Sequence, residues 1–267
     1  MRNHIGMDKP MNEAGWAEGD GAVWQLATVE RIRVETERIK TFTLRLSEWK
    51  KFMPGQHVDV RLSGLGSNSP TSSFSIASAP EAKGVIELTI QGSPDDELAD
   101  YFHERLQSGD TIALKGPLGE NFVWSATLGG PLLLIAGGSG VVPIMSMLRH
   151  RTNVDLNIPA LLLYSVNSLD DVIYRYELDR RGANESQLTV LYTLTEVQPA
   201  GWRGYARRID RAMLADTLVQ LGTPAHVYVC GSTGFVETVL DGLTALRVSN
   251  AIIRTAKFGR DSVRIGG

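Results

Sequence analysis

The stretch LLIAGGSGVVP, residues 133–143, decides the fold of this chain. Its apolar first half has the length of a buried strand, and its glycines permit a sharp turn. Pro143 fits the first turn of a helix that follows. A strand, a glycine turn and a helix predict a parallel α/β domain whose turn binds a phosphate at the helix N-terminus. A turn without a ligand is the alternative, because the pattern GxGxxP differs from the dinucleotide fingerprint GxGxxG.

The second half of the chain repeats this rhythm. Apolar runs begin near residues 131, 160, 188 and 225, spaced roughly as in βαβ units of about 30 residues. The runs LLLIA, ALLLY, LTVLYTL and HVYVC are continuous rather than alternating, which indicates strands buried on both faces by helices. We therefore predict a doubly wound parallel sheet over residues 129–267, with a ligand crevice at the carboxyl ends of its strands.

The first half has a β-rich texture. Over residues 23–128, short runs of β-branched and aromatic residues are bounded by turn residues, and only residues 97–106 have helical spacing. Residues 1–22 lack the apolar segment of a secretory signal, and we expect a flexible tail there. We predict a small antiparallel barrel of six strands, at residues 29–34, 41–46, 57–62, 74–77, 85–91 and 111–115.

Composition narrows the functional classes. The chain has 267 residues, and its 27 Lys and Arg against 30 Asp and Glu give a net charge of −3, which does not favour a nucleic-acid partner. No apolar run reaches the ~18 residues that a membrane span needs. Cys230 is the only cysteine, which excludes an internal disulfide and cysteine-based metal or iron–sulfur sites. We expect a cytoplasmic protein without a metal site.

Several motifs, taken in order, resemble the ferredoxin–NADP reductase family, in particular reductases of bacterial oxygenases. The resemblance implies a barrel that holds FAD or FMN, followed by a domain that holds NADH or NADPH. It also implies that a hydride passes from nicotinamide to flavin, and that electrons then leave singly for a protein partner. The motifs are PGQHVDVRL (54–62), SFSIASAP (73–80), GD…LKGPLG (109–119), IAGGSGVVP (135–143), LLYS…DDVIYRYEL (162–178), VYVCGSTGF (227–235) and KFG (257–259).

The resemblance implies roles for particular residues. Ser75 would lie beside the flavin N5 atom, Cys230 near the nicotinamide, and Phe258 over the flavin ring; these are the expected catalytic positions. Phe74 stands where the family has a Tyr packed against the flavin. Further expected cofactor contacts are Ser72, Ser73, Thr89, Ile90, Gln91, Leu98, Ala99, Gly137, Gly138, Ser139, Gly140, Asn167, Arg175 and Gly231.

The flavin motifs depart from the family where the diphosphate would bind. In the family motif Arg-x-Tyr-Ser the Arg pairs with that diphosphate, and here Ser72 stands in its place. The family motif Gly-x-x-Ser corresponds to Asp96 through Ala99, which lacks both the glycine and the Ser hydroxyl. One charge-assisted hydrogen bond is worth ~1.5–3 kcal/mol, roughly 10- to 150-fold in affinity. We therefore expect FAD to bind weakly, with FMN as an alternative.

The nucleotide motifs leave the choice between NADH and NADPH open. NADP-preferring relatives often carry an Arg after Tyr-Ser, where this chain has Asn167. Arg175 is a candidate for contact with a 2′-phosphate and equally a solvated helix residue. The acidic residue that many relatives have shortly before the terminal aromatic is Ala256 here, so no proton relay is expected at that position.

Two functions are consistent with these residues. The first is an NAD(P)H-dependent flavin oxidoreductase that passes electrons to a separate acceptor: an iron–sulfur protein, an oxygenase or free flavin. The alternative is a family member with a degenerate flavin site that serves as a non-redox enzyme or a partner-binding subunit. The glycine turn and Ser75 favour the first.

Overall fold

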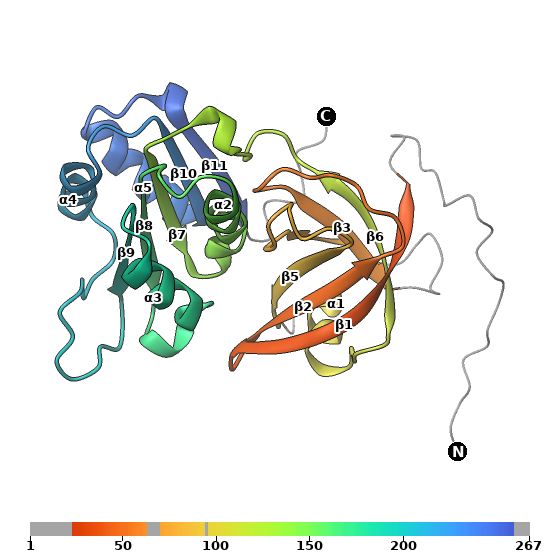
Figure 1. Cartoon of the computed structure of the whole chain (residues 1–267). Helices are drawn as coiled ribbons and strands as arrows, with labels where there is room; N and C mark the ends of the chain where they lie inside the picture. The colour runs from red at the N-terminus through yellow and green to blue at the C-terminus, as the bar shows by residue number, and fades with distance from the viewer. Residues whose placement is uncertain (1–22, 63–69, 94–95, 259–267) are drawn as a thin grey trace, which may run out of the picture.

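The structure is a computed structural model that describes residues 23–62, 70–93 and 96–258. It has two lobes, a six-stranded antiparallel sheet followed along the chain by a five-stranded parallel sheet (Figure 1). This confirms the predicted fold class. The tail expected at residues 1–22, and residues 259–267 at the end of the predicted second domain, lie outside the described residues. Within the described ranges, no helix is long and apolar enough to cross a membrane.

The first lobe is a barrel whose strands follow the order β4-β3-β6-β1-β2-β5. A bridge between Ile76, directly after β4, and Leu88 of β5 closes the ring. Alternate side chains fill its centre, and helix α1 covers it by burying Leu98 and Phe102. The elements are β1 (Trp24–Thr36), β2 (Ile39–Leu46), β3 (His57–Leu62), β4 (Ser72–Ser75), β5 (Val85–Gln91), α1 (Glu97–Glu104) and β6 (Thr111–Leu118).

The second lobe is a parallel sheet with the order β11-β10-β7-β8-β9 and helices on both faces. The strands are β7 (Leu132–Gly137), β8 (Ala160–Val166), β9 (Leu188–Leu194), β10 (His226–Ser232) and β11 (Ile253–Phe258). The α-helices are α2 (Val141–Val154), α3 (Arg175–Asn184), α4 (Arg211–Leu221) and α5 (Thr233–Ala245). Short 3-10 helices are η1 (Ala126–Leu128), η2 (Gly138–Gly140), η3 (Leu169–Asp171) and η4 (Asn250–Ile252).

The continuous apolar runs are explained by burial on both faces. In β7, Leu132, Leu134 and Ala136 pack with residues of α2 and α3, while Leu133 and Ile135 pack with residues of α4 and α5. Alternate side chains of one strand thus enter two cores. The strand β11 was not predicted, because this edge strand has partly exposed, mixed polar and apolar residues rather than a buried apolar run.

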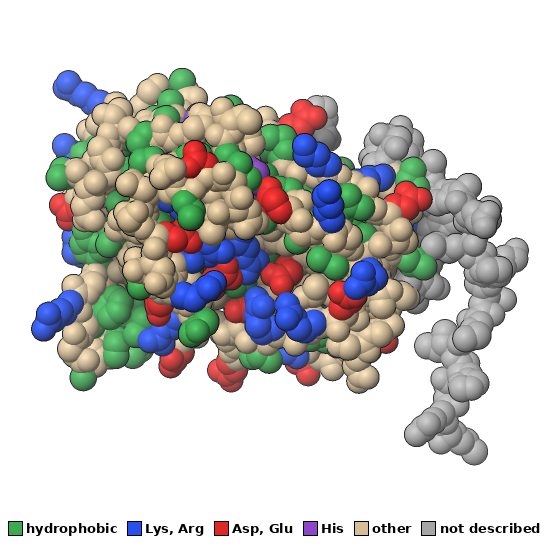
Figure 2. Space-filling model, in the orientation of Figure 1, with side chains coloured by type: hydrophobic (Ala, Val, Ile, Leu, Met, Phe, Trp, Pro, Cys, Tyr) green, Lys and Arg blue, Asp and Glu red, His purple; other side chains and the backbone are tan. Residues whose placement is uncertain are grey.

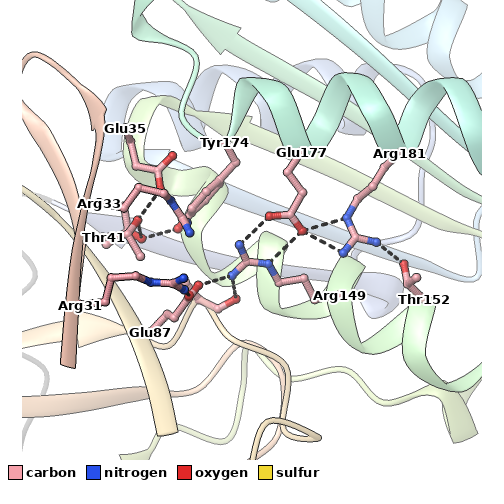
Figure 3. A network of polar contacts seen from close by, with 12 residues as sticks. Arg31, Arg33, Glu35, Thr41, Glu87, Arg149, Thr152, Tyr174, Glu177 and Arg181 are labelled. Atoms are coloured by element: carbon pink, nitrogen blue, oxygen red, sulfur yellow. Dashed lines mark hydrogen bonds and ion pairs between the residues drawn. The ribbon is translucent and has the colours of Figure 1, made fainter. Parts of the chain in front are cut away.

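A polar network joins the two lobes (Figure 3). The guanidinium of Arg149, on α2, donates to Glu177 of α3 at 2.6 Å. It also donates to Glu87 of β5 at 2.8 Å, across the boundary between the barrel and the second lobe, which we call the seam. It also donates to the Ala77 carbonyl at 2.9 Å, just after β4. Nearby, Ser146 of α2 donates to a second backbone carbonyl of the same segment, at 2.6 Å. The helix α2 is therefore fixed to the barrel by groups largely withdrawn from water.

Two further contacts extend this network. The Tyr174 hydroxyl, which precedes α3, donates to Thr89 of β5, and the Thr89 hydroxyl is also 2.8 Å from that of Thr41. On the other side, Arg181 holds Glu177 in an ion pair at 2.8 Å. Burial alone would raise the pKa of Glu177, but hydrogen bonds from Arg149 and Arg181 hold that pKa at about 2.

Replacing Glu177 with Gln should remove part of the acid sensitivity of folding. Because the folded pKa is depressed to about 2 from an ordinary value of 4.5, the ion pairs stabilise the fold fully above pH 4.5. That contribution is lost as the pH falls toward 2. In urea denaturation, E177Q should lower the free energy of unfolding more near neutral pH than near pH 2. We expect the two losses to differ by up to about 3 kcal/mol.

The matched control is Glu196→Gln, which neutralises an exposed carboxylate. This variant should unfold like the wild type at every pH. A difference between wild type and E177Q that does not change between neutral and acid pH would contradict the network described here.

Candidate functional site

The predicted glycine turn lies where the strand order of the parallel sheet reverses, between the neighbouring strands β7 and β10. Gly137 ends β7 and Gly138–Gly140 follow it, while Cys230 and Gly231 lie at the end of β10, so both segments reach the same sheet edge. In a doubly wound sheet this switch point is where ligands bind. A Cβ on Gly140 would lie 2.1 Å from the Cys230 carbonyl oxygen, so the close approach of the two segments requires a glycine there.

The N-terminus of α2 retains hydrogen-bonding capacity. Gly140 is its N-cap residue, and no side chain among the described residues caps it. Gly138 has a φ of +52°, and a Cβ at that position would face open space. The α2 helix continues directly from the 3-10 helix η2, and the N–H of its first residue, Val141, is bonded to the carbonyls of Gly138 and Ser139. The donors for a ligand are therefore those of the glycine turn, and together with the partial positive charge of the helix N-terminus they suit a phosphate. The residues here fit the diphosphate of a nicotinamide nucleotide.

The barrel brings Ser75 to the same seam. Ser75 ends β4, and the next segment, Ala77–Ser78, is the one that α2 contacts through Arg149 and Ser146. The glycine turn η2 lies against β5 as well as against the strands of the parallel sheet. The half-buried Ser75 hydroxyl has no hydrogen-bond partner within the described parts of the chain. One rigid helix therefore fixes the glycine turn relative to Ser75.

Cys230 and Phe258 also lie beside this seam. Phe258 ends β11 opposite Ser232, and it packs partly buried against the core cluster that contains Ala77 and Cys230. The Cys230 side chain is fully buried, and burial raises the pKa of its thiol well above the ordinary value. Burial therefore favours Cys230 as a packing residue with a protonated thiol. Its predicted place near the nicotinamide stays a prediction.

The predicted flavin diphosphate site is occupied by the chain itself. Asp96 is the N-cap of α1, and its Oδ1 accepts the backbone N–H groups of Leu98 and Ala99, each at 3.0 Å. The Ser72 hydroxyl donates to the same carboxylate, 3.3 Å from Oδ1 and 3.2 Å from Oδ2. The side chains of Leu98 and Ala99 are buried in the barrel core. Their side chains are thus withdrawn from a ligand and their amides are already bonded, and their contact with a cofactor stays a prediction.

Other predicted flavin contacts have structural partners. Phe74 is half-buried, with its ring centroid 5.8 Å from that of Phe102 on α1. The Ser73 hydroxyl donates to Asp59 at 2.6 Å. Ile90 lies in the barrel core, which leaves only its backbone for a ligand, and the Thr89 hydroxyl belongs to the network between the lobes. Gln91 is exposed. Of these described residues, Ser75, the exposed Gln91 and the partly exposed face of Phe74 remain open to a flavin ring.

The two residues predicted to select the nucleotide have different partners. Asn167 follows β8, and its side-chain oxygen accepts a hydrogen bond from Thr195 at 3.2 Å. Arg175 is exposed at the start of α3, 3.8 Å from Asp179. It lines a hollow of about 640 Å³, between the β1–β2 hairpin and α3, whose lining includes none of the glycine-turn residues. The contact of Arg175 with a 2′-phosphate stays a prediction.

Two family models match this chain, one over the barrel and one over the parallel sheet. The oxidoreductase FAD-binding domain model matches residues 26–123, and the oxidoreductase NAD-binding domain model matches residues 134–241. The chain belongs to the ferredoxin–NADP reductase family. It is similar to the ferredoxin–NAD(P)(+) reductase component of the naphthalene 1,2-dioxygenase system of Pseudomonas putida, with 29% identity over 212 residues. The match covers 79% of this chain and 62% of that relative.

Solved structures of family members share the fold. The FAD/NAD-binding domain of nitric oxide dioxygenase from Vibrio cholerae O1 biovar El Tor has a TM-score of 0.77 at 21% identity, covering 88% of this chain and 98% of that one. A ferredoxin NADP+ reductase from Neisseria gonorrhoeae, with bound FAD and NADP, has a TM-score of 0.73 at 18% identity, with 88% and 98% coverage. At these identities the likeness concerns the fold.

Gly140→Ala should be tolerated much less well than Gly138→Ala. The added methyl at position 140 meets backbone at 2.1 Å, whereas at position 138 it meets open space and only the left-handed φ opposes it. We expect urea denaturation to show a loss of about 1 kcal/mol for Gly138→Ala and about 3 kcal/mol or more for Gly140→Ala. Equal losses would show that the glycine turn and β10 are not in close contact.

Proposed function

We propose that this chain is an NAD(P)H-dependent flavin oxidoreductase that passes electrons to a separate acceptor. The observation that carries this proposal is the single helix α2, which starts at the glycine turn and is bonded to the segment directly after Ser75. Both predicted cofactor edges are thereby held along one seam. The reaction needs this geometry, because hydride transfer requires donor and acceptor atoms to approach to ~3–3.5 Å.

The residues around the seam divide the work. The glycine turn at the α2 N-terminus would bind the nucleotide diphosphate, and Gly138 leaves room for it. The Ser75 hydroxyl would hydrogen-bond the reacting edge of a bound flavin, and Phe258 would cover the flavin ring against water. A bound flavin supplies the conversion of a two-electron hydride into single electrons, which is cofactor chemistry. The protein contributes binding, orientation and the exclusion of water.

The acceptor in this proposal is a second molecule. The Pseudomonas putida relative is named as a component of a dioxygenase system, which supports an iron–sulfur protein or an oxygenase as acceptor, with free flavin as the third candidate. On the face shown in Figure 2, Lys and Arg side chains gather beside Asp and Glu side chains along the seam between the lobes. We place the reaction in the cytoplasm, because the single, buried cysteine suits a reducing compartment.

A second candidate function is supported by one observation. The carboxylate of Asp96 occupies the amides where a flavin diphosphate was expected, which favours a partner-binding or non-redox protein with the family fold. Mixing the purified protein with NADH or NADPH and added FAD or FMN separates the two. The proposed function predicts flavin-dependent loss of nicotinamide absorbance. No flavin binding and no oxidation of either nucleotide would favour the second candidate.

Replacing Ser75 with Ala should slow the oxidation of NAD(P)H in the presence of added flavin. The change removes a hydroxyl that has no partner among the described residues, so the fold loses nothing while the flavin edge loses one hydrogen bond. We expect a rate at least about tenfold lower, measured at saturating nucleotide. Ser73→Ala is the matched control, since its hydroxyl is bonded to Asp59, and it should change the rate by less than about twofold. Equal effects of the two variants would contradict the role of Ser75.

A further inference from the structure

The N-terminus of α1 carries its own anion. We propose that this chain binds flavin through its ring and not through its phosphate tail, so that FAD, FMN and riboflavin all enter and leave as exchangeable substrates. This inference rests on the proposed function and names the class of flavin that the site accepts.

Asp96 satisfies the groups that a diphosphate would need. Two backbone donors of the first turn, the N–H groups of Leu98 and Ala99, are bonded to its carboxylate at 3.0 Å. The Ser72 hydroxyl, from the adjacent strand β4, is a third donor directed to the same group. A phosphate at this place would have to displace a carboxylate of the same chain, or lie beside it and be repelled.

The described charges of α1 itself do not offset this. Glu97 and Asp100 add two further carboxylates in the first turn of α1. The ammonium of Lys40 contacts α1 at the opposite end, where it donates to the His103 carbonyl at 2.6 Å. The part of α1 that would meet a phosphate is therefore negative, and this nearby cation is bonded elsewhere.

The helix α2 provides an internal comparison. Its N-terminus has a glycine N-cap, has no side-chain cap among the described residues, and carries no acidic residue in its first turn. The helix α1 has an Asp cap and two acidic residues in the same positions. One chain thus leaves one helix N-terminus open to an anion and closes the other. The open end suits NAD(P)H, and the closed end leaves the flavin ring edge near Ser75 as the group to be bound.

A flavin held in this way exchanges with solution. FAD, FMN and riboflavin share the ring and differ in the phosphate and adenosine parts, so a site that contacts the ring alone binds all three with similar affinity. Contacts to the tail are what would make FAD a tightly held group, because each charge-assisted bond contributes roughly 10-fold or more.

The test measures dissociation constants of FAD, FMN and riboflavin by fluorescence titration of the full chain and two variants. Asp96→Gly frees the two amides and removes the charge, and glycine is an acceptable N-cap. Glu97→Gln removes one charge from the same turn but frees no amide, since Glu97 is exposed and Asp96 keeps its bonds. Circular dichroism checks that both variants are folded.

We expect the wild type to bind the three flavins within about threefold of one another. Asp96→Gly should tighten FAD at least about tenfold and leave riboflavin unchanged, while Glu97→Gln should change each affinity by less than about threefold. FAD binding to the wild type more than about tenfold tighter than riboflavin would overturn this inference and leave the proposed function standing. An unchanged FAD-to-riboflavin ratio in Asp96→Gly would also overturn it. Failure of all three flavins to bind wild type and variant would overturn the proposed function together with the inference.

Discussion

The guanidinium of Arg149 fixes the relative position of the two lobes. It lies on α2, with only 12% of its side chain exposed, and its partners come from α3, from β5 and from the backbone after β4. Burial alone would lower its pKa, but the hydrogen bond to Glu177 and the charges of Glu177 and Glu87 outweigh burial and raise it. A buried ion pair of this kind adds little net stability, yet it strongly disfavours any arrangement that breaks it. Because α2 also begins at the glycine turn, Arg149 determines how that turn faces the barrel.

The two ends of the seam differ in chemistry. At the sheet edge, a glycine turn and an uncapped helix leave backbone donors for a nucleotide phosphate. At the barrel edge, the Asp96 carboxylate accepts the backbone N–H groups of the first turn of α1, and the Ser72 hydroxyl donates to the same carboxylate. The chain has the two domains of its family together with a flavin site that is closed at one end. This difference is the basis of the proposal that the flavin is loosely held.

The fold could be predicted from sequence because the apolar patterns, the turn residues and the spacing of the strands all indicated the same two domains. Continuous apolar runs follow from the two-sided burial of β7 and its neighbours, and the short β-rich runs of the first half follow from a small antiparallel barrel. The site could be predicted only in part. The sequence shows that Asp96 departs from the family motif, but its hydrogen bonds depend on the tertiary contact between β4 and the start of α1. Tyr174, in a left-handed conformation with φ 58°, and its bond to Thr89 had no local signal, because that contact joins residues from two lobes.

The most direct measurement of this account is a crystal structure of the protein with FAD and a non-reactive NAD(P)H analogue. The account predicts the nucleotide diphosphate at the α2 N-terminus, the flavin ring beside Ser75, and the Asp96 carboxylate still bonded to the amides of Leu98 and Ala99. In that result the phosphates of FAD lie away from α1. Phosphate oxygens bonded to those two amides, with the Asp96 side chain turned away, would contradict it.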